Sequence, residues 1–238
     1  KRTIRVGGMA QSSAKRIVDG ARKRGQRTLS EYDSKRVLKA YGVPIAREVL
    51  VPTQTAARDA ARKLGYPVVL KACSADEIHK TEKGLVAVGI GTDRALVDAF
   101  RSLKLRAGKH YDGDYLVQEM VKGDREIMIG MIRDDQFGPS VMFGLGGIFT
   151  EILEDVVFRV APLTKRDARE MVRSIRGHRI LDEIRGMEAV DVDLLTRCLV
   201  GIGRLGLDFP EISEVDINPM IVRGARPIAV DGLIVFDA

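Results

Sequence analysis

Aromatic residues are scarce in this chain. Tryptophan is absent, and aromatic residues together make up 5% of the 238 residues. Proteins that bind single-stranded nucleic acid stack bases on aromatic side chains, so the net charge of +6 is weak evidence for such a partner. Basic residues gather near the start of the chain, and basic runs usually form a solvated surface. That surface suits many anionic ligands or acidic partners, and we expect no nucleic-acid partner.

Cysteine and long apolar runs are also lacking. The two cysteines, Cys73 and Cys198, lie far apart in the sequence, which argues against a zinc site and against a disulfide framework. We therefore expect a reducing compartment, the cytoplasm. No apolar run approaches the roughly 18 residues that span a bilayer, and no apolar signal-peptide core follows the basic start. We expect no membrane partner.

The common phosphate-binding loop G-x-x-x-x-G-K-[ST] is absent as well. A literal G-x-G-x-x-G does occur from Gly201 to Gly206, but a dinucleotide fingerprint must follow a strand and open a helix. The apolar residues before it, Val192, Leu195 and Leu199, recur at helical spacing. The sequence therefore predicts a helix here rather than a dinucleotide site.

The composition is that of a globular protein, with 45% hydrophobic and 30% charged residues. A chain of this length can bury a sizeable core as one large domain or two small ones. Predicted strands and helices alternate without an uninterrupted βαβ array. This pattern predicts an α/β (α+β) fold of two lobes.

Turn and cap residues place the individual elements. Ser30 and Gly42 bracket one helix, and Thr53 and Gly65 bracket the next. Helices are expected at 30–42, 53–65, 92–106, 164–176 and 191–205. Strands are expected at 43–51, 66–72, 84–90, 114–121, 125–134, 139–144 and 156–163.

The stretch from Val215 to Asp231 is the most informative. It reads as a strand with carboxylate and amide oxygens, a short turn, and a return strand with another carboxylate. Mg²⁺ prefers oxygen ligands and takes the remainder from water and phosphates. A hairpin with Asn218 and Asp231 on one face would form half of such a site. The alternative is an ordinary edge hairpin with a solvated Asp and an Asn-Pro turn.

Two residues of the N-terminal half could take part in binding or catalysis. Lys71 ends the apolar run Val68–Leu70 before a polar loop, where it could meet a phosphate; the alternative is an edge lysine whose head reaches solvent. His79 lies in that loop. A loop histidine is usually only solvated, but imidazole is also a competent nucleophile toward phosphoryl groups.

Several segments together resemble ATP-grasp enzymes, in particular the nucleotide-binding subunit of ADP-forming acyl-CoA synthetases. The resemblance covers residues 28–238, with the motifs in the expected order. The matching segments are GYPVVLKACSADEIHKTEKGLVAVGI, LVQEMVKGDREIMIG, FGPSVMFGLGGIFTEILEDVVFRVAPL and DINPM…AVDGLI. The resemblance implies an ATP-grasp fold with nucleotide held between two lobes. It also implies ATP or ADP as substrate and Mg²⁺ as cofactor.

The resemblance also implies roles for single residues. Lys71 would contact ATP phosphates, and His79 would accept a phosphoryl group from a second phosphohistidine and pass it to ADP. The cation would bind Asn218 and Asp231.

The segment that follows the strand 114–121 resembles the hinge between the lobes. Backbone groups of Glu119, Met120 and Val121 would read the adenine edge, with Gln118 nearby. Glu126 would face the nucleotide; the alternative is a solvated strand carboxylate.

A glycine cluster at Gly144, Gly146 and Gly147 could present backbone N–H groups to an anion, or form tight turns or a bulge. In the family this segment lies near the docking place of the partner histidine. Glu151 and Arg159 lie there without an assigned role.

The expected organisation is an N-terminal basic extension at 1–27, a first lobe at 28–115 with the histidine loop, and a second lobe at 116–238 with the metal-binding hairpin. The implied reaction is acyl-CoA + ADP + phosphate ⇌ acid + ATP + CoA, as in acetate–CoA ligase. The CoA-binding and acyl-phosphate-forming domains would belong to an alpha subunit, in an α₂β₂ heterotetramer. Two alternatives stay open, a stand-alone ligase that joins a carboxylate to an amine and a nucleotide sensor without chemistry.

Overall fold

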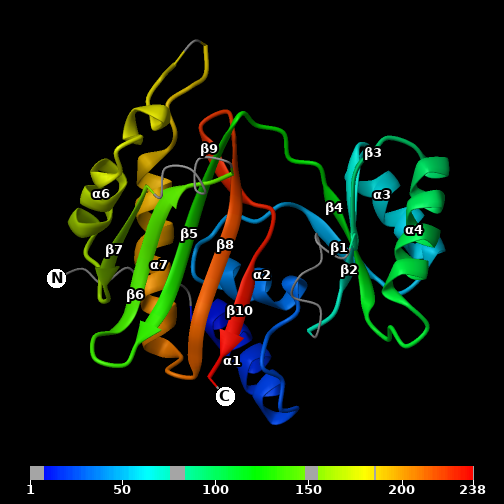
Figure 1. Ribbon diagram of the computed structural model, residues 1–238, viewed down its shortest axis with the longest axis horizontal. Helices are drawn as coiled ribbons and strands as arrows, with labels where there is room; N and C mark the ends of the chain where they lie inside the picture. Colours follow the sequence, from blue (N-terminus) through cyan, green and yellow to red (C-terminus); the bar gives the residue numbers. More distant parts are fainter. Residues whose placement is uncertain (1–7, 76–83, 148–154, 185, 238) are drawn as a thin grey trace. The chain divides into compact units, whose positions relative to one another are not determined.

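The computed structural model describes residues 8–75, 84–147, 155–184 and 186–237 (Figure 1). The helices are α1 Gly8–Lys23, α2 Glu31–Ala40, α3 Gln54–Leu64, α4 Asp93–Ala107, α6 Lys165–Ser174, the 3-10 helix η1 His178–Leu181, and α7 Val192–Asp208. The strands are β1 Glu48–Val51, β2 Val68–Cys73, β3 Val86–Ile90, β4 Asp114–Glu119, β5 Arg125–Asp134, β6 Gly138–Leu145, β7 Val156–Val160, β8 Ile212–Arg223, β9 Arg226–Ala229 and β10 Leu233–Phe236.

These elements form two compact units that interleave along the chain. The larger unit comprises residues 1–29, 33–45 and 122–238, and the smaller unit comprises 30–32 and 46–121. The expected lobes were consecutive, with a boundary between 115 and 116. In the structure, the segment that includes most of α2 belongs to the larger unit instead.

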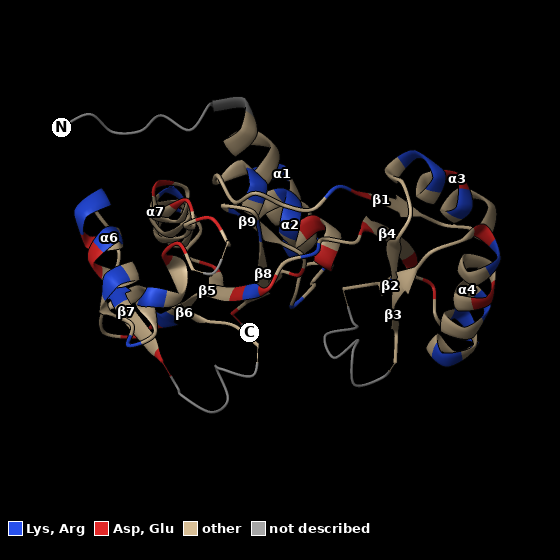
Figure 2. Cartoon of the chain, turned by 90° about the horizontal axis from the view of Figure 1, so that it is seen from above, with Lys and Arg blue, Asp and Glu red and all other residues tan. Residues whose placement is uncertain are grey.

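The smaller unit is an antiparallel sheet with α3 and α4 on one face. Its four strands follow the order β1-β4-β2-β3, and Figure 2 shows both helices on the same side of the strands. Strand side chains alternate between the faces. Val68 and Leu70 of β2 pack with the helices in one apolar cluster. Val69 and Lys71 therefore lie on the opposite face, where both are also buried.

The larger unit is built around a six-stranded sheet of order β10-β8-β5-β6-β7, with β9 pairing to β8. Figure 2 shows α1, α2 and α7 on one side of this sheet. The core contains inward residues of β5 and β6, such as Ile129 and Phe143, together with Leu199 of α7. The alternate strand positions, among them Gly130 and Asp216, lie on the open face.

The basic residues of the start of the chain sit on a helix that is part of the larger core. Ala14, Val18 and Ala21 of α1 are at most 1% exposed, and their spacing places them on one helical face. Arg22 and Lys23 end this helix, where cations interact favourably with the helix dipole. In Figure 2, acidic residues interrupt the basic ones along α3, α4 and α6.

The G-x-G-x-x-G pattern lies within α7, as its helical spacing predicted. A Cβ atom on Gly201 would lie 2.0 Å from the Tyr41 carbonyl oxygen, and one on Gly206 would lie 2.6 Å from Pro139 Cβ. These glycines allow α7 to approach its neighbours closely. Their role in the larger unit is packing.

The strand expected at 43–51 forms only at its end, in β1. Residues up to Ile45 belong to the larger unit and those from Ala46 to the smaller. Ile45 makes an isolated parallel bridge to Ala229, whereas Glu48 pairs with Gln118 of β4. A segment divided between two units cannot pair along one sheet, which explains the shorter strand.

Both cysteines are buried, and neither is in a disulfide. Burial raises the pKa of the Cys198 thiol to about 12, so this thiol is unreactive at neutral pH. Among the residues that the structure describes, no helix is long and apolar enough to cross a membrane.

Candidate nucleotide and metal site

The residues expected to bind a cation meet at a gap along one edge of β8. Strand β9 pairs with β8 as far as Met220↔Ala229, and β10 pairs with it from Asp216↔Leu233. Residues 230–232 cross the gap between these two partners. The Val230 N–H donates to the Pro219 carbonyl at 3.2 Å, which places Asp231 opposite Asn218 in the register.

Strand alternation brings a third oxygen-bearing side chain to this gap. Asp216 and Asn218 are two residues apart on β8, so both side chains lie on the open face of the sheet. Asn218 is exposed, and Asp216 and Asp231 are half-buried. The hairpin pattern already contained Asp216, but only the pairing with β10 shows its position beside the gap.

The local charge is unfavourable without a cation. Burial, and then the negative charges of Glu214 and Asp231, raise the pKa of Asp216 from 3.8 to about 6. A divalent cation would remove this repulsion and use the same oxygens. No group of three or more His, Cys, Asp or Glu side chains in the described part of the chain could hold a metal by itself. The side chains at the gap carry the oxygen donors that Mg²⁺ prefers, so a Mg²⁺ site here stays a prediction and would need further oxygens from water and a ligand.

Helix α2 packs against residues 230–232, the segment that crosses the gap. Lys35 is completely buried, and its ammonium lies 3.4 Å from the Val230 carbonyl oxygen. A Cβ atom on Gly232 would lie 2.9 Å from Leu38 Cδ1 and 3.3 Å from Lys35 Cγ. A glycine at 232 thus lets the turn bearing Asp231 rest directly on α2.

Asp216→Asn tests this electrostatic description. Because the folded-state pKa of Asp216 lies above its ordinary value, the charged form destabilises the fold, and this penalty grows as pH rises from about 4 to 6. At pH 7.5 the variant is expected to have a higher free energy of unfolding by on the order of 1 kcal/mol, allowing for partial solvent exposure. Below about pH 4 the difference should vanish. Urea unfolding at both pH values measures it; equal stabilisation at both would contradict the description.

Glu126 lies at the start of β5 against the glycine cluster. Its side chain is exposed, and Met128 shares its face by alternation. The Gly146 N–H donates to the Glu126 carbonyl at 2.8 Å, so this N–H is not available to an anion. A Cβ atom on Gly147 would lie 2.8 Å from Glu126 Oε2. The cluster thus allows close packing around Glu126.

Arg159 of β7 is exposed and donates to the Phe158 carbonyl. Glu151 lies outside the described residues, and so does His79. Their roles stay predictions from the sequence.

Lys71 in the smaller unit has a partner that the sequence did not predict. Its ammonium lies 2.7 Å from Glu31 Oε1, and the side chains are 7% and 1% exposed. Glu31 follows the cap residue Ser30, and the sequence pattern indicated only a helix start there. The pair joins residues far apart in the sequence, and no local signal shows it.

The side chains of Gln118 and Glu119 are also held by neighbours in the smaller unit. Gln118 Nε2 donates to Glu48 at 2.9 Å. The Glu119 carboxylate accepts from the Arg47 backbone N–H at 2.9 Å and from its guanidinium. These bonds fix the end of β4, where the sequence predicts recognition of a base by the backbone.

The backbone donors of this segment are partly used. The Glu119 N–H donates to the Arg47 carbonyl at 2.8 Å, and the Met120 N–H donates to the Pro67 carbonyl at 3.3 Å. In the described structure, the Val121 N–H is the donor of this segment without a bond. It is therefore the N–H that can meet a ligand here.

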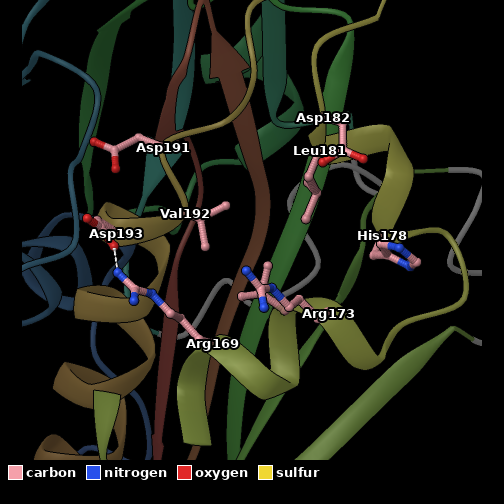
Figure 3. A pocket seen from close by; sticks show the side chains of 9 residues that line it. Arg169, Arg173, His178, Leu181, Asp182, Asp191, Val192 and Asp193 are labelled. Atoms are coloured by element: carbon pink, nitrogen blue, oxygen red, sulfur yellow. Dashed lines mark hydrogen bonds and ion pairs between the residues drawn. The ribbon is translucent and has the colours of Figure 1, made fainter. Parts of the chain in front are cut away.

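A cavity of about 630 Å³ lies in another part of the larger unit, between α6, η1 and α7 (Figure 3). Arg169 pairs with Asp193 across it, and Asp191 caps α7 by accepting from the Leu194 N–H. None of the site residues that the structure describes lines this cavity. The ion pair between Arg169 and Asp193 connects α6 to α7 beside this cavity.

Comparisons with known proteins agree with the ATP-grasp fold expected from the sequence. A family model described as an ATP-grasp domain matches residues 20–236. The beta subunit of ADP-forming acetate–CoA ligase I from Pyrococcus furiosus is 42% identical over 225 residues, which cover 92% of this chain and 96% of that subunit.

Solved structures of acetyl-coenzyme A synthetase 1 from Candidatus Korarchaeum cryptofilum are also similar. The complex with coenzyme A and Ca-AMPCP has a TM-score of 0.89 at 35% identity, covering 94% of this chain and all 100% of that one. A complex with coenzyme A and Mg-AMPPCP, whose phosphohistidine segment points towards the nucleotide binding site, has a TM-score of 0.82 at 35% identity, with the same coverage. The chain therefore belongs to the ATP-grasp family, in the branch of the beta subunits of ADP-forming acetate–CoA ligases.

Proposed function

We propose that this chain binds ADP and transfers a phosphoryl group to it, as part of the reaction acyl-CoA + ADP + phosphate ⇌ acid + ATP + CoA. The observation that carries the proposal is the gap on β8, where Asn218 and Asp231 lie opposite each other beside Asp216. The binding of Mg-AMPPCP by the Korarchaeum relative supports it.

Asn218 and Asp231 would hold Mg²⁺, with further ligands from water and nucleotide phosphates. When bound, Mg²⁺ neutralises charge on the transferring phosphoryl group. The neighbouring Asp216 would favour a cation because Glu214 and Asp231 lie close to it, and burial, followed by these negative charges, raises the pKa of Asp216. Lys71 would contact phosphate as a point charge.

His79 is the proposed covalent carrier. A ring nitrogen of His79 attacks the phosphorus of a phosphohistidine on the partner, and the donor's N–P bond breaks as the new one forms. A terminal oxygen of ADP then attacks that phosphorus, the N–P bond to His79 breaks, and ATP leaves. Both steps transfer one phosphoryl group, and each imidazole recovers its electron pair.

The adenine base of the nucleotide would lie against the end of β4. Two of the three N–H groups in this segment are used within the smaller unit, so the Val121 N–H is proposed as the donor to adenine. Gln118, Glu119 and Met120 shape this edge, and Glu126 of the larger unit would face the nucleotide.

The partner is proposed to be an alpha subunit with the CoA-binding domain and the donor histidine, in an α₂β₂ heterotetramer. The name of the Pyrococcus relative, a subunit beta, supports a partner of this kind. A cytoplasmic location is part of the same proposal.

Reconstitution tests this function. The chain alone is expected to bind ADP with Mg²⁺ but to form no ATP from acetyl-CoA, ADP and phosphate. Addition of the alpha subunit should start ATP formation, measured by a coupled luminescence assay. Amide formation by the chain alone, from a carboxylate and an amine, would favour the stand-alone ligase. Tight ADP binding without turnover, with the partner present, would favour the sensor.

A further inference from the structure

The buried ion pair between Glu31 and Lys71 is the basis of this inference. The two charged atoms are 2.7 Å apart, and both side chains are almost completely removed from solvent. Lys71 lies on the face of the smaller sheet opposite α3 and α4, in a cross-strand row with Leu116 and Val86. Burial of an ammonium beside such apolar neighbours is costly unless a carboxylate or phosphate partner is present.

Glu31 is well placed to be that partner. It is the first residue of α2, where the partial positive charge of a helix N-terminus stabilises a carboxylate. Glu31 and Lys71 both belong to the smaller unit, and the Glu31 side chain is only 1% exposed. A buried carboxylate in contact restricts the flexible lysine side chain, which would otherwise sample many rotamers.

We propose that Glu31 is a positioning residue that holds the Lys71 ammonium in place and oriented for the phosphates of the nucleotide. The inference rests on the proposed function, in which Lys71 contacts those phosphates. An ammonium has three N–H donors, so a bond to Glu31 does not prevent Lys71 from donating to a phosphate oxygen. Pre-orientation lowers the entropy lost when the nucleotide binds.

The charge of Glu31 also repels a phosphate, and the distances decide which effect is larger. Lys71 would touch the phosphate, whereas Glu31 lies behind the ammonium that it contacts. Attraction at the shorter distance exceeds repulsion at the longer one, so the paired lysine still attracts phosphate. Removal of Glu31 removes this weaker repulsion but also the orientation of Lys71. We expect the loss of orientation to dominate, so the binding of phosphate-bearing ligands should weaken.

A double-mutant cycle on ligand affinity tests the proposal. Glu31→Ala, Lys71→Ala and the double variant are compared by calorimetry with Mg-ADP and with adenosine, which has no phosphate. Glu31→Ala is expected to weaken ADP binding about tenfold, as for loss of one charge-assisted contact, with adenosine affinity unchanged. The double variant should bind ADP no more weakly than Lys71→Ala, because Glu31 acts through Lys71.

Control variants separate positioning from damage to the fold. Asp93→Asn breaks the exposed ion pair to Arg62 in the same unit and should leave both affinities unchanged. Glu31→Gln keeps a hydrogen-bond acceptor and should restore part of the ADP affinity. Its unfolding temperature shows whether the unit stays folded.

The contrary outcomes are distinct. Unchanged or tighter ADP binding by Glu31→Ala would overturn the positioning role, and so would an equal loss of adenosine binding. Additive losses in the double variant would mean that Glu31 acts independently of Lys71. If Lys71→Ala bound ADP normally, the proposed contact of Lys71 with phosphate would fail instead.

Discussion

His79→Ala is expected to abolish phosphorylation of this chain by Mg-ATP. In the proposed reaction, His79 is the nucleophile that becomes covalently phosphorylated. Loss of a covalent nucleophile lowers turnover by about 1,000-fold or more in other enzymes. Overall ATP synthesis with the alpha subunit should fall by a similar factor, with ADP affinity nearly unchanged.

The measurement is intact-mass and phosphoryl-label analysis after incubation with Mg-ATP and whichever partner co-purifies. Wild-type protein should acquire an acid-labile, alkali-stable phosphate that is absent from His79→Ala. His110→Ala is the matched control, because His110 is exposed in a turn after α4, and it should label normally. Equal labelling of wild type and His79→Ala would move the relay to another residue.

Asp231→Ala is expected to remove the Mg²⁺ dependence of nucleotide binding. The gap on β8 offers the cation only a few protein oxygens, so loss of one carboxylate removes much of its charge. Even indirect partners of metal sites change metal affinity by about 10- to 100-fold, and we expect at least this loss for Mg²⁺. Asn218→Ala should act in the same direction with a smaller effect, because an amide has no net charge.

Calorimetric titration of ADP at several Mg²⁺ concentrations, and in EDTA, measures this effect. The variants should match wild type in EDTA and differ increasingly as Mg²⁺ rises. Asp237→Ala is the matched control, since Asp237 follows β10 and is exposed. An unchanged Mg²⁺ dependence in both site variants would place the metal elsewhere.

Sequence reasoning worked best where local periodicity and caps decide the structure. The predicted strand at 125–134 coincides with β5, and Thr53, Thr92 and Thr164 cap α3, α4 and α6. Apolar spacing identified α7 in spite of the G-x-G-x-x-G pattern. These features depend on neighbouring residues in the chain, so the amino-acid sequence alone specifies them.

Local sequence patterns did not predict contacts between residues that lie far apart in the chain. Glu31 and Lys71 are 40 residues apart, and Asp216 gains its place beside Asp231 through the pairing of β10 with β8. The third strand of the terminal region, β10, was not predicted. Neither composition nor spacing encodes which strand edges meet, because that choice depends on packing of the whole sheet.

The sequence by itself thus determined the family and most of the succession of helices and strands, and it predicts the cation site around Asn218 and Asp231. Those features follow from local spacing and from motifs in a particular order. The tertiary structure alone decided that the units interleave, that β9 and β10 leave a gap on β8, and that Glu31 neutralises Lys71. The physical reason is that burial and charge pairing act between segments that only the folded chain brings together.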